Sequence, residues 1–188
     1  MRKLPYKVNN KMAGFTLIEV MATLVLLGLV TALSVQHFMP VDSFSTESAG
    51  SLTGTLGSIQ GAYNAYVNDK NQLPAFGSNN NALEDSSFVP VYLFIPRPPS
   101  GFDSSYGVSG FQLGQRSGQD TPNNGVYICA KAPSVTATSV PYRAIVKSAA
   151  ALSANKFFYN DSCPATSSFT SDPSSASDVY VTCWIVRN

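Results

Sequence analysis

The sequence contains little of what enzymatic chemistry needs. Among its 188 residues there is one histidine, and charged residues make up only 12%. A Ser-His-Asp or Cys-His arrangement needs a histidine base, but His37 stands just after a long apolar run, far from the C-terminal half. The ligands of a zinc site are not grouped, and the adjacent acids Glu84 and Asp85 stand in a polar loop, where such acids are usually solvated. We therefore predict that the protein is not an enzyme and uses no cofactor.

Positive charge is also scarce outside the N-terminus. Four of the twelve basic residues precede the long apolar run, and these are Arg2, Lys3, Lys7 and Lys11. A chain without residues 1–14 would keep eight basic and eleven acidic residues, a side-chain charge of −3. Because binding to phosphate backbones requires clustered Lys and Arg, we expect no nucleic acid among the partners.

The long apolar run covers residues 15–35 and reads FTLIEVMATLVLLGLVTALSV. As a helix it would be about 31 Å long, close to the hydrocarbon thickness of a bilayer. We predict a transmembrane helix over residues 15–38, with the basic leader 1–14 in the cytoplasm and the rest of the chain outside it. A cleaved secretory signal or a featureless anchor is the alternative. The run is longer than the apolar region of a signal, however, and Leu33–His37 does not form an A-x-A cleavage pattern.

One acidic residue, Glu19, interrupts this run. A carboxylate at the centre of a membrane helix costs roughly 2.5–3.5 kcal/mol, and somewhat less near the membrane edge, so it requires a partner. A cut after Gly14 would create an α-amino group on Phe15, about 6 Å along a helix from Glu19. At low dielectric the amine and the carboxylate could neutralise each other across two neighbouring helices. A tolerated acid at the membrane edge is the alternative.

The sequence GFTLIEV at residues 14–20 resembles the G-F-T-L-I-E motif of type IV pilins and of the pseudopilins of type II secretion. The resemblance combines a short basic leader, a glycine, a phenylalanine, a glutamate and a long apolar run. It implies that a membrane-embedded prepilin peptidase cleaves between Gly14 and Phe15 and methylates the new amine. It also implies that Phe15, Thr16 and Glu19 guide assembly into a filament.

We therefore predict a structural subunit of a bacterial type IV pilus, with a type II secretion pseudopilin or a membrane-anchored binding module that never polymerises as alternatives. Many major pilins and pseudopilins carry a proline near the end of the apolar run, whereas the next proline here is Pro40, which favours a minor pilin. The expected partners are the prepilin peptidase, other pilin subunits and the inner-membrane assembly platform. The protein would reside in the inner membrane and then in an extracellular pilus or a periplasmic pseudopilus.

Residues 39–188 are predicted to form an extracytoplasmic head. A helix over residues 50–72 is indicated by apolar residues at helical spacing, which would pack on a sheet. These residues are Leu52, Leu56, Ile59, Tyr63, Tyr66 and Val67. Residues 40–48 could kink or interrupt the helical region, and the turn-forming residues of 77–87 and 96–120 predict loops.

Strands are expected downstream of this helix, on the basis of β-branched and aromatic residues. The candidates are residues 89–95, which contain Pro90, and residues 125–130, 142–147, 156–159 and 179–186. A long helix followed by strands and polar turns predicts an α+β fold, in which an N-terminal helical spine packs on an antiparallel sheet.

Three cysteines in an extracytoplasmic compartment predict one disulfide and one free thiol. Cys163 and Cys183 enclose a Ser-rich loop of about 20 residues, whose closure would contribute about 3 kcal/mol. This favoured pair resembles the disulfide-bounded C-terminal loop of many pilins. Pairing of Cys129 with Cys163 is the alternative, and three reduced thiols are a third.

The same Ser-rich loop contains three oxygen-bearing side chains that could bind calcium, those of Asp172, Ser174 and Asp178. Some pseudopilins bind calcium in their C-terminal loops, so the resemblance raises this possibility. Turns capped by aspartate side chains are the favoured role for these residues, so we predict no metal site and keep calcium as the alternative.

Overall fold

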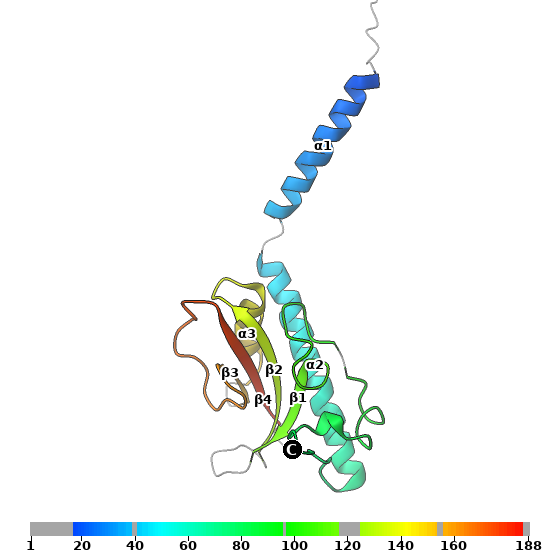
Figure 1. Ribbon diagram of the computed structural model, residues 1–188, viewed down its shortest axis with the longest axis vertical. Helices are drawn as coiled ribbons and strands as arrows, with labels where there is room; N and C mark the ends of the chain where they lie inside the picture. The colour runs from blue at the N-terminus through cyan, green and yellow to red at the C-terminus, as the bar shows by residue number, and fades with distance from the viewer. Residues whose placement is uncertain (1–16, 39–40, 96, 117–124, 154–155, 186–188) are drawn as a thin grey trace, which may run out of the picture. The chain divides into compact units, whose positions relative to one another are not determined.

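The computed structural model describes residues 17–38, 41–95, 97–116, 125–153 and 156–185. The chain divides into two compact units, Met1–Pro40 and Val41–Asn188, and each is described by itself. The second unit is called the head below. The described residues form three α-helices and a four-stranded antiparallel sheet, which confirms the predicted α+β class (Figure 1).

The N-terminal unit contains helix α1, Leu17–Phe38. The predicted helix over residues 15–38 is thus present, and the first two residues of that range lie outside the described part. The side chains of residues 17–28 are exposed, among them four consecutive large apolar residues at positions 24–27. No helix among the described residues combines the length and hydropathy needed to cross a membrane.

The head begins with helix α2, Val41–Lys70. All six apolar residues that predicted it are buried, so the amphipathic helix is confirmed. Residues 41–48 are helical, so no interruption falls within them; Pro40, which stands between the end of α1 and the start of α2, lies outside the described residues. The Ser45 and Thr46 hydroxyls both donate to the Asp42 carbonyl oxygen within the same helix, at 3.0 and 2.7 Å. Polar side chains that bond back in this way are compatible with a helix, although such bonds slightly destabilise it.

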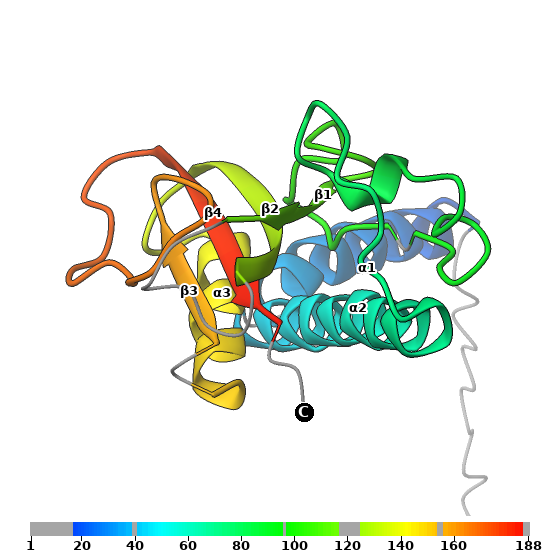
Figure 2. The ribbon, with the colours of Figure 1, turned by 90° about the horizontal axis from the view of Figure 1, so that it is seen from below.

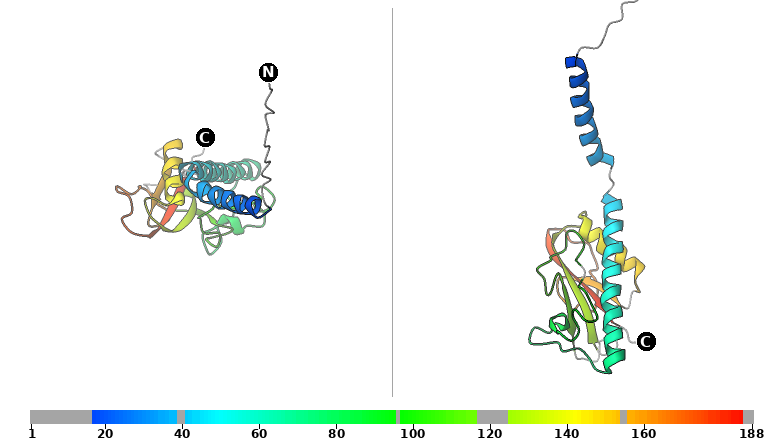
Figure 3. Two further views of the ribbon diagram at one scale, coloured as in Figure 1. Left: turned by 90° about the horizontal axis from the view of Figure 1, so that it is seen from above. Right: turned by 90° about the vertical axis from the view of Figure 1, so that its right-hand side faces the viewer.

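The sheet of the head has the strand order β1-β2-β4-β3, and all neighbouring strands are antiparallel. Its strands are β1 Phe111–Gln115, β2 Val126–Val135, β3 Phe157–Asn160 and β4 Ser177–Trp184. Helices α2 and α3, Val140–Ala151, lie on the same face of this sheet and enclose the main core with it (Figures 1 and 3). The other face carries a smaller cluster formed by Tyr127, Cys129 and Trp184.

The predicted strand over residues 142–147 is wrong, because these residues belong to α3. Ser139 stands at the N-cap and Pro141 in the first turn, where a missing N–H costs no helical hydrogen bond. Tyr142, Ile145 and Ser148 are buried at a spacing of three residues, which is a helical period and not a strand period.

The predicted strand over residues 89–95 is also absent. The N–H groups of Val89 and Tyr92 donate to carbonyls four residues earlier, those of Asp85 and Phe88, so this segment forms turns. Conversely, β1 lies inside the region predicted as loop. Its Gly114 looked like a turn former, but a Cβ there would collide with the Tyr127 ring, which covers the strand at this point.

Candidate functional site

The residues predicted for processing and assembly lie at the start of α1. Gly14, Phe15 and Thr16 are outside the described residues, so their roles remain predictions. Glu19 lies in the first turn of α1, where the helix dipole favours a negative charge, and its side chain is exposed among exposed apolar residues. No described residue forms a hydrogen bond or ion pair with its carboxylate. The α1 surface therefore combines one carboxylate with apolar side chains that the described residues leave uncovered.

The disulfide of the head joins Cys129 to Cys163, with 6.4 Å between their Cα atoms. The favoured prediction of a Cys163–Cys183 pair is therefore wrong, and the alternative pair is present. Residues opposite one another on antiparallel strands point to the same face of a sheet. Because Cys129 pairs with Thr182 and Ile128 pairs with Cys183, Cys129 and Cys183 point to opposite faces. Cys163 packs on the Cys129 face.

Cys183 is a buried free thiol in the main core. Burial raises the pKa of this thiol to about 11, because the thiolate would lose its hydration. The thiol is therefore protonated at neutral pH and is a poor nucleophile. A structural role in packing explains its position.

The disulfide fixes a short segment over the outer face of the sheet. The Ala165 N–H donates to the Thr182 hydroxyl at 2.9 Å, and the Trp184 indole N–H donates to the Ala165 carbonyl at 2.9 Å. Trp184 is fully buried and makes an edge-to-face contact with Tyr127 at 5.5 Å between ring centroids. Segment 163–165 thus covers an aromatic cluster that would otherwise face water.

The calcium candidates are hydrogen bonded to different parts of the head. Asp172 accepts from the Tyr142 hydroxyl at 2.7 Å. Asp178 forms an ion pair with Lys131 at 2.8 Å and accepts from the Ser134 N–H at 3.0 Å, and these contacts lower the pKa of its carboxyl. Ser174 is exposed. Among the described residues, no three His, Cys, Asp or Glu side chains are grouped to hold a metal ion. Calcium binding at these residues remains an untested alternative.

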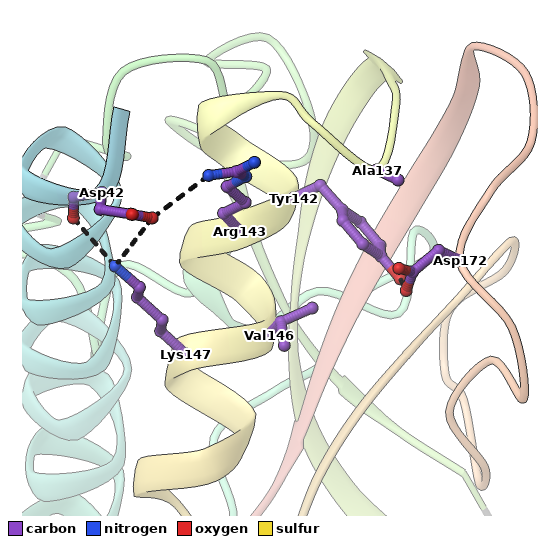
Figure 4. Close-up of a pocket in the computed structure, with 7 residues that line it drawn as sticks. All are labelled: Asp42, Ala137, Tyr142, Arg143, Val146, Lys147 and Asp172. Carbon is purple, nitrogen blue, oxygen red and sulfur yellow. Dashed lines mark hydrogen bonds and ion pairs between the residues drawn. The ribbon is translucent and has the colours of Figure 1, made fainter. Parts of the chain in front are cut away.

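A shallow pocket of about 210 Å³ lies between the start of α2 and the outer side of α3 (Figure 4). Its polar side is an ionic cluster, in which Arg143 and Lys147 both approach the Asp42 carboxylate, at 3.2 and 3.8 Å. The Lys147 ammonium also donates to the Asp42 carbonyl, the Ser45 hydroxyl and the Thr46 hydroxyl, at 2.8–2.9 Å. These contacts join α3 to the first two turns of α2.

The sequence analysis missed this cluster. Asp42 and Lys147 are 105 residues apart, and neither stands in a motif. The helical spacing of the apolar residues in 140–151 could have placed both Arg143 and Lys147 on one side of α3, but their partner on α2 carries no sequence signal.

Replacing Lys147 with Ala should lower the free energy of unfolding of the head by about 1 kcal/mol, because several acceptors lose their donor while remaining partly accessible to water. Arg143→Ala is the matched control, since Arg143 is on the same helix and its side chain is similarly exposed, 39% against 37%. It should cost about 0.5 kcal/mol or less. Urea unfolding measures both changes, and equal losses would contradict the special role of Lys147.

A comparison with protein families matches the prokaryotic N-terminal methylation motif to residues 9–35. The match covers the end of the basic leader and the greater part of α1, and it does not extend into the head. Comparisons with curated proteins and with solved structures gave no match. The N-terminal region of this chain therefore carries the prepilin signature of type IV pilins and pseudopilins.

Proposed function

We propose that this protein is a structural subunit of a type IV pilus. It is made as a prepilin, cleaved after Gly14, methylated on the new Phe15 amine and assembled through its N-terminal helix. The observation that carries the proposal is the N-terminal methylation motif at residues 9–35. This motif implies processing by a prepilin peptidase and assembly with other pilin subunits.

The surface of α1 supports this proposal. Successive helical residues are rotated by about 100°, so the exposed apolar side chains at positions 24–27 occur on every side of the helix. A helix that is apolar all round is normally buried, either among other helices or in lipid. Lipid would cover α1 in the inner membrane before assembly, and the helices of neighbouring subunits would cover it in the filament.

The position of Glu19 supports an interaction between subunits. Cleavage would create a positive charge at Phe15, and a helix continued back to that residue would place the charge about 6 Å from Glu19. Two subunits offset along a filament could bring the Phe15 amine of one chain to the Glu19 carboxylate of the next. Pairing would remove the cost of burying either charge alone.

The head is consistent with a structural role outside the cytoplasm. Its disulfide suits an oxidising compartment. Calcium in the C-terminal loop would favour a pseudopilin. The two carboxylates considered for it, those of Asp172 and Asp178, are already bonded to Tyr142 and Lys131. The disulfide-closed C-terminal loop expected for a pilin is not formed either, because Cys183 is unpaired.

Because pilins and pseudopilins share the N-terminal motif, the distinction between pilus and pseudopilus depends on the location of the mature protein. We propose a minor subunit, because many major pilins carry a proline near the end of the apolar run and residues 15–38 contain none. Low abundance in sheared fibres relative to other subunits would agree with this assignment, and a dominant band would contradict it.

Mass spectrometry of the protein from membranes and from sheared filaments tests the proposed function. We expect a mature chain that begins at N-methylated Phe15 in both fractions. A chain that retains Met1 in the filament fraction would contradict the proposal. A mature chain found only in membranes, with none in sheared filaments, would favour a periplasmic pseudopilin or the membrane-anchored binding module over a pilus subunit.

A further inference from the structure

Strand β1 lies at one edge of the sheet, so its backbone groups on one side cannot pair with β2 (Figure 2). These outward groups belong to Phe111, Leu113 and Gln115. An edge of this kind is a template for pairing with a strand of another chain. In this protein, other groups of the same head bond to these outward positions.

The side chain of Asn80 occupies the position that a neighbouring strand would take. Its amide oxygen accepts from the Gln115 N–H at 3.0 Å, and its amide nitrogen donates to the Gln115 carbonyl at 2.9 Å. These are the two hydrogen bonds that a residue of an adjacent antiparallel strand would form with Gln115. The side-chain amide thus replaces a peptide group.

The other outward positions of β1 are occupied as well. The Asn81 amide oxygen accepts from the Leu113 N–H at 2.9 Å, and Asn81 is buried. Phe111 forms two backbone hydrogen bonds with Val108, at 2.8 and 3.1 Å. At least one outward group of each of the three residues is therefore bound within the head.

Asn80 is held in this position by its backbone and its neighbours. It has a φ of 51°, in the left-handed region that Asn tolerates better than most residues. Its carbonyl accepts from the Gln112 side chain at 3.2 Å, and its amide nitrogen also lies 3.2 Å from the Tyr127 hydroxyl. The side chain is therefore fixed at the strand edge.

The opposite edge of the sheet, at β3, is covered by the chain itself. The Phe169 N–H donates to the Tyr159 carbonyl at 3.0 Å, and the Tyr159 N–H donates to the Ser168 hydroxyl at 3.2 Å. The Asn160 side chain donates to the Ser167 carbonyl at 3.1 Å. The two edges are thus closed by different means: β3 by a chain segment, and β1 largely by two side-chain amides.

We propose that Asn80 and Asn81 close the β1 edge against strand pairing with a second copy of this chain. The partner is a second copy because two β1 edges can pair antiparallel around a two-fold axis, each offering the same groups to the other. In an assembly that holds many heads side by side, pairing between open β1 edges would compete with the contacts of the assembly. This inference concerns the head alone and holds for either kind of filament.

The test uses the full-length protein in detergent micelles and the substitution Asn80→Gly. Glycine adopts a φ of 51° readily, so this change removes the amide without straining the backbone. Asn71→Gly is the matched control, because Asn71 has the same φ of 51° and none of the hydrogen bonds that close β1 involves it.

Hydrogen exchange is the first measurement. In the unmodified protein we expect the Gln115 and Leu113 amides to be protected, as befits bonded strand amides. In Asn80→Gly, exchange of the Gln115 amide should become on the order of tenfold faster, and Asn71→Gly should leave it unchanged. An unprotected Gln115 amide in the unmodified protein would overturn the proposal without any variant.

Association is the second measurement, followed by light scattering with the micelle mass subtracted. Asn80→Gly should form larger species as its concentration rises, and the unmodified protein and Asn71→Gly should not. Adding Gln115→Pro to Asn80→Gly should abolish this association, because proline has no N–H to offer a second strand. A folded Asn80→Gly that keeps the unmodified size at every concentration would overturn the proposal, and so would association that survives Gln115→Pro.

Discussion

Replacing Glu19 with Ala is expected to leave the chain cleaved after Gly14 but to lower its incorporation into filaments by roughly a hundredfold or more. Removing one member of a buried charge pair leaves the other charge unpaired, which costs about 3–5 kcal/mol. In the proposed filament, that unpaired charge is the Phe15 amine of the neighbouring subunit. The measurement is the ratio of mature protein in sheared filaments to mature protein in membranes.

Two further variants distinguish charge pairing from general damage. Glu19→Gln keeps the size of the side chain and loses its charge, so it should assemble as poorly as Glu19→Ala. Glu47→Ala removes an exposed acid from α2 and should assemble normally. Normal assembly of Glu19→Ala would contradict the pairing mechanism, and poor assembly of Glu47→Ala would show that the assay responds to any lost acid.

The parts of this protein that could be predicted from its sequence are those whose signal is local. The apolar residues of α2 recur at helical spacing from Leu52 to Val67, and every one of them is buried. The N-terminal motif occupies consecutive residues, and the family match to residues 9–35 agrees with it. The alternation of side chains along strand β4 is also a local signal, and its residues Val179 and Val181 face the main core.

Errors arose where the composition of a segment conflicted with its tertiary setting. The residues Tyr142 to Lys147 contain β-branched and aromatic residues typical of strands, yet Ser139 and Pro141 start a helix there. Gly114 was counted as a turn former, although its small size lets Tyr127 pack across β1. Ser139 and Pro141, which start the helix, precede the segment that was predicted as a strand. The role of Gly114 depends on Tyr127, which is distant in the sequence.

The contacts that define the head surface have no local signal at all. Asn80 bonds to Gln115 across 35 residues, and Lys147 bonds to the start of α2 across more than a hundred.

The disulfide is an intermediate case. Cys183 stands in phase with the core residues Val179 and Val181, so the alternation of β4 already placed its thiol on the core face. The predicted Cys163–Cys183 pair rested on the loop between the two cysteines, and the length of a loop does not show which face of a strand a side chain occupies.

The arrangement of the cysteines leads to the second large effect. Cys163→Ser should lower the free energy of unfolding of the head by about 4 kcal/mol, because the Cys129–Cys163 bond closes a loop with a sequence separation of 34 residues. The loss also releases segment 163–165 from the Trp184 cluster. Urea unfolding followed by the fluorescence of Trp184, the one tryptophan of the chain, measures it.

Cys183→Ala is the matched control, since it removes a buried thiol without breaking a bond. It should cost only about 1 kcal/mol, as is usual for a small change in a core. The double variant Cys129→Ser/Cys163→Ser should be about as stable as Cys163→Ser alone, because one bond can be lost only once. A larger loss for Cys183→Ala than for Cys129→Ser would instead indicate the Cys163–Cys183 pair. The β2–β4 register opposes that pair, because it holds Cys183 on the helix-covered face and Cys163 packs on the other.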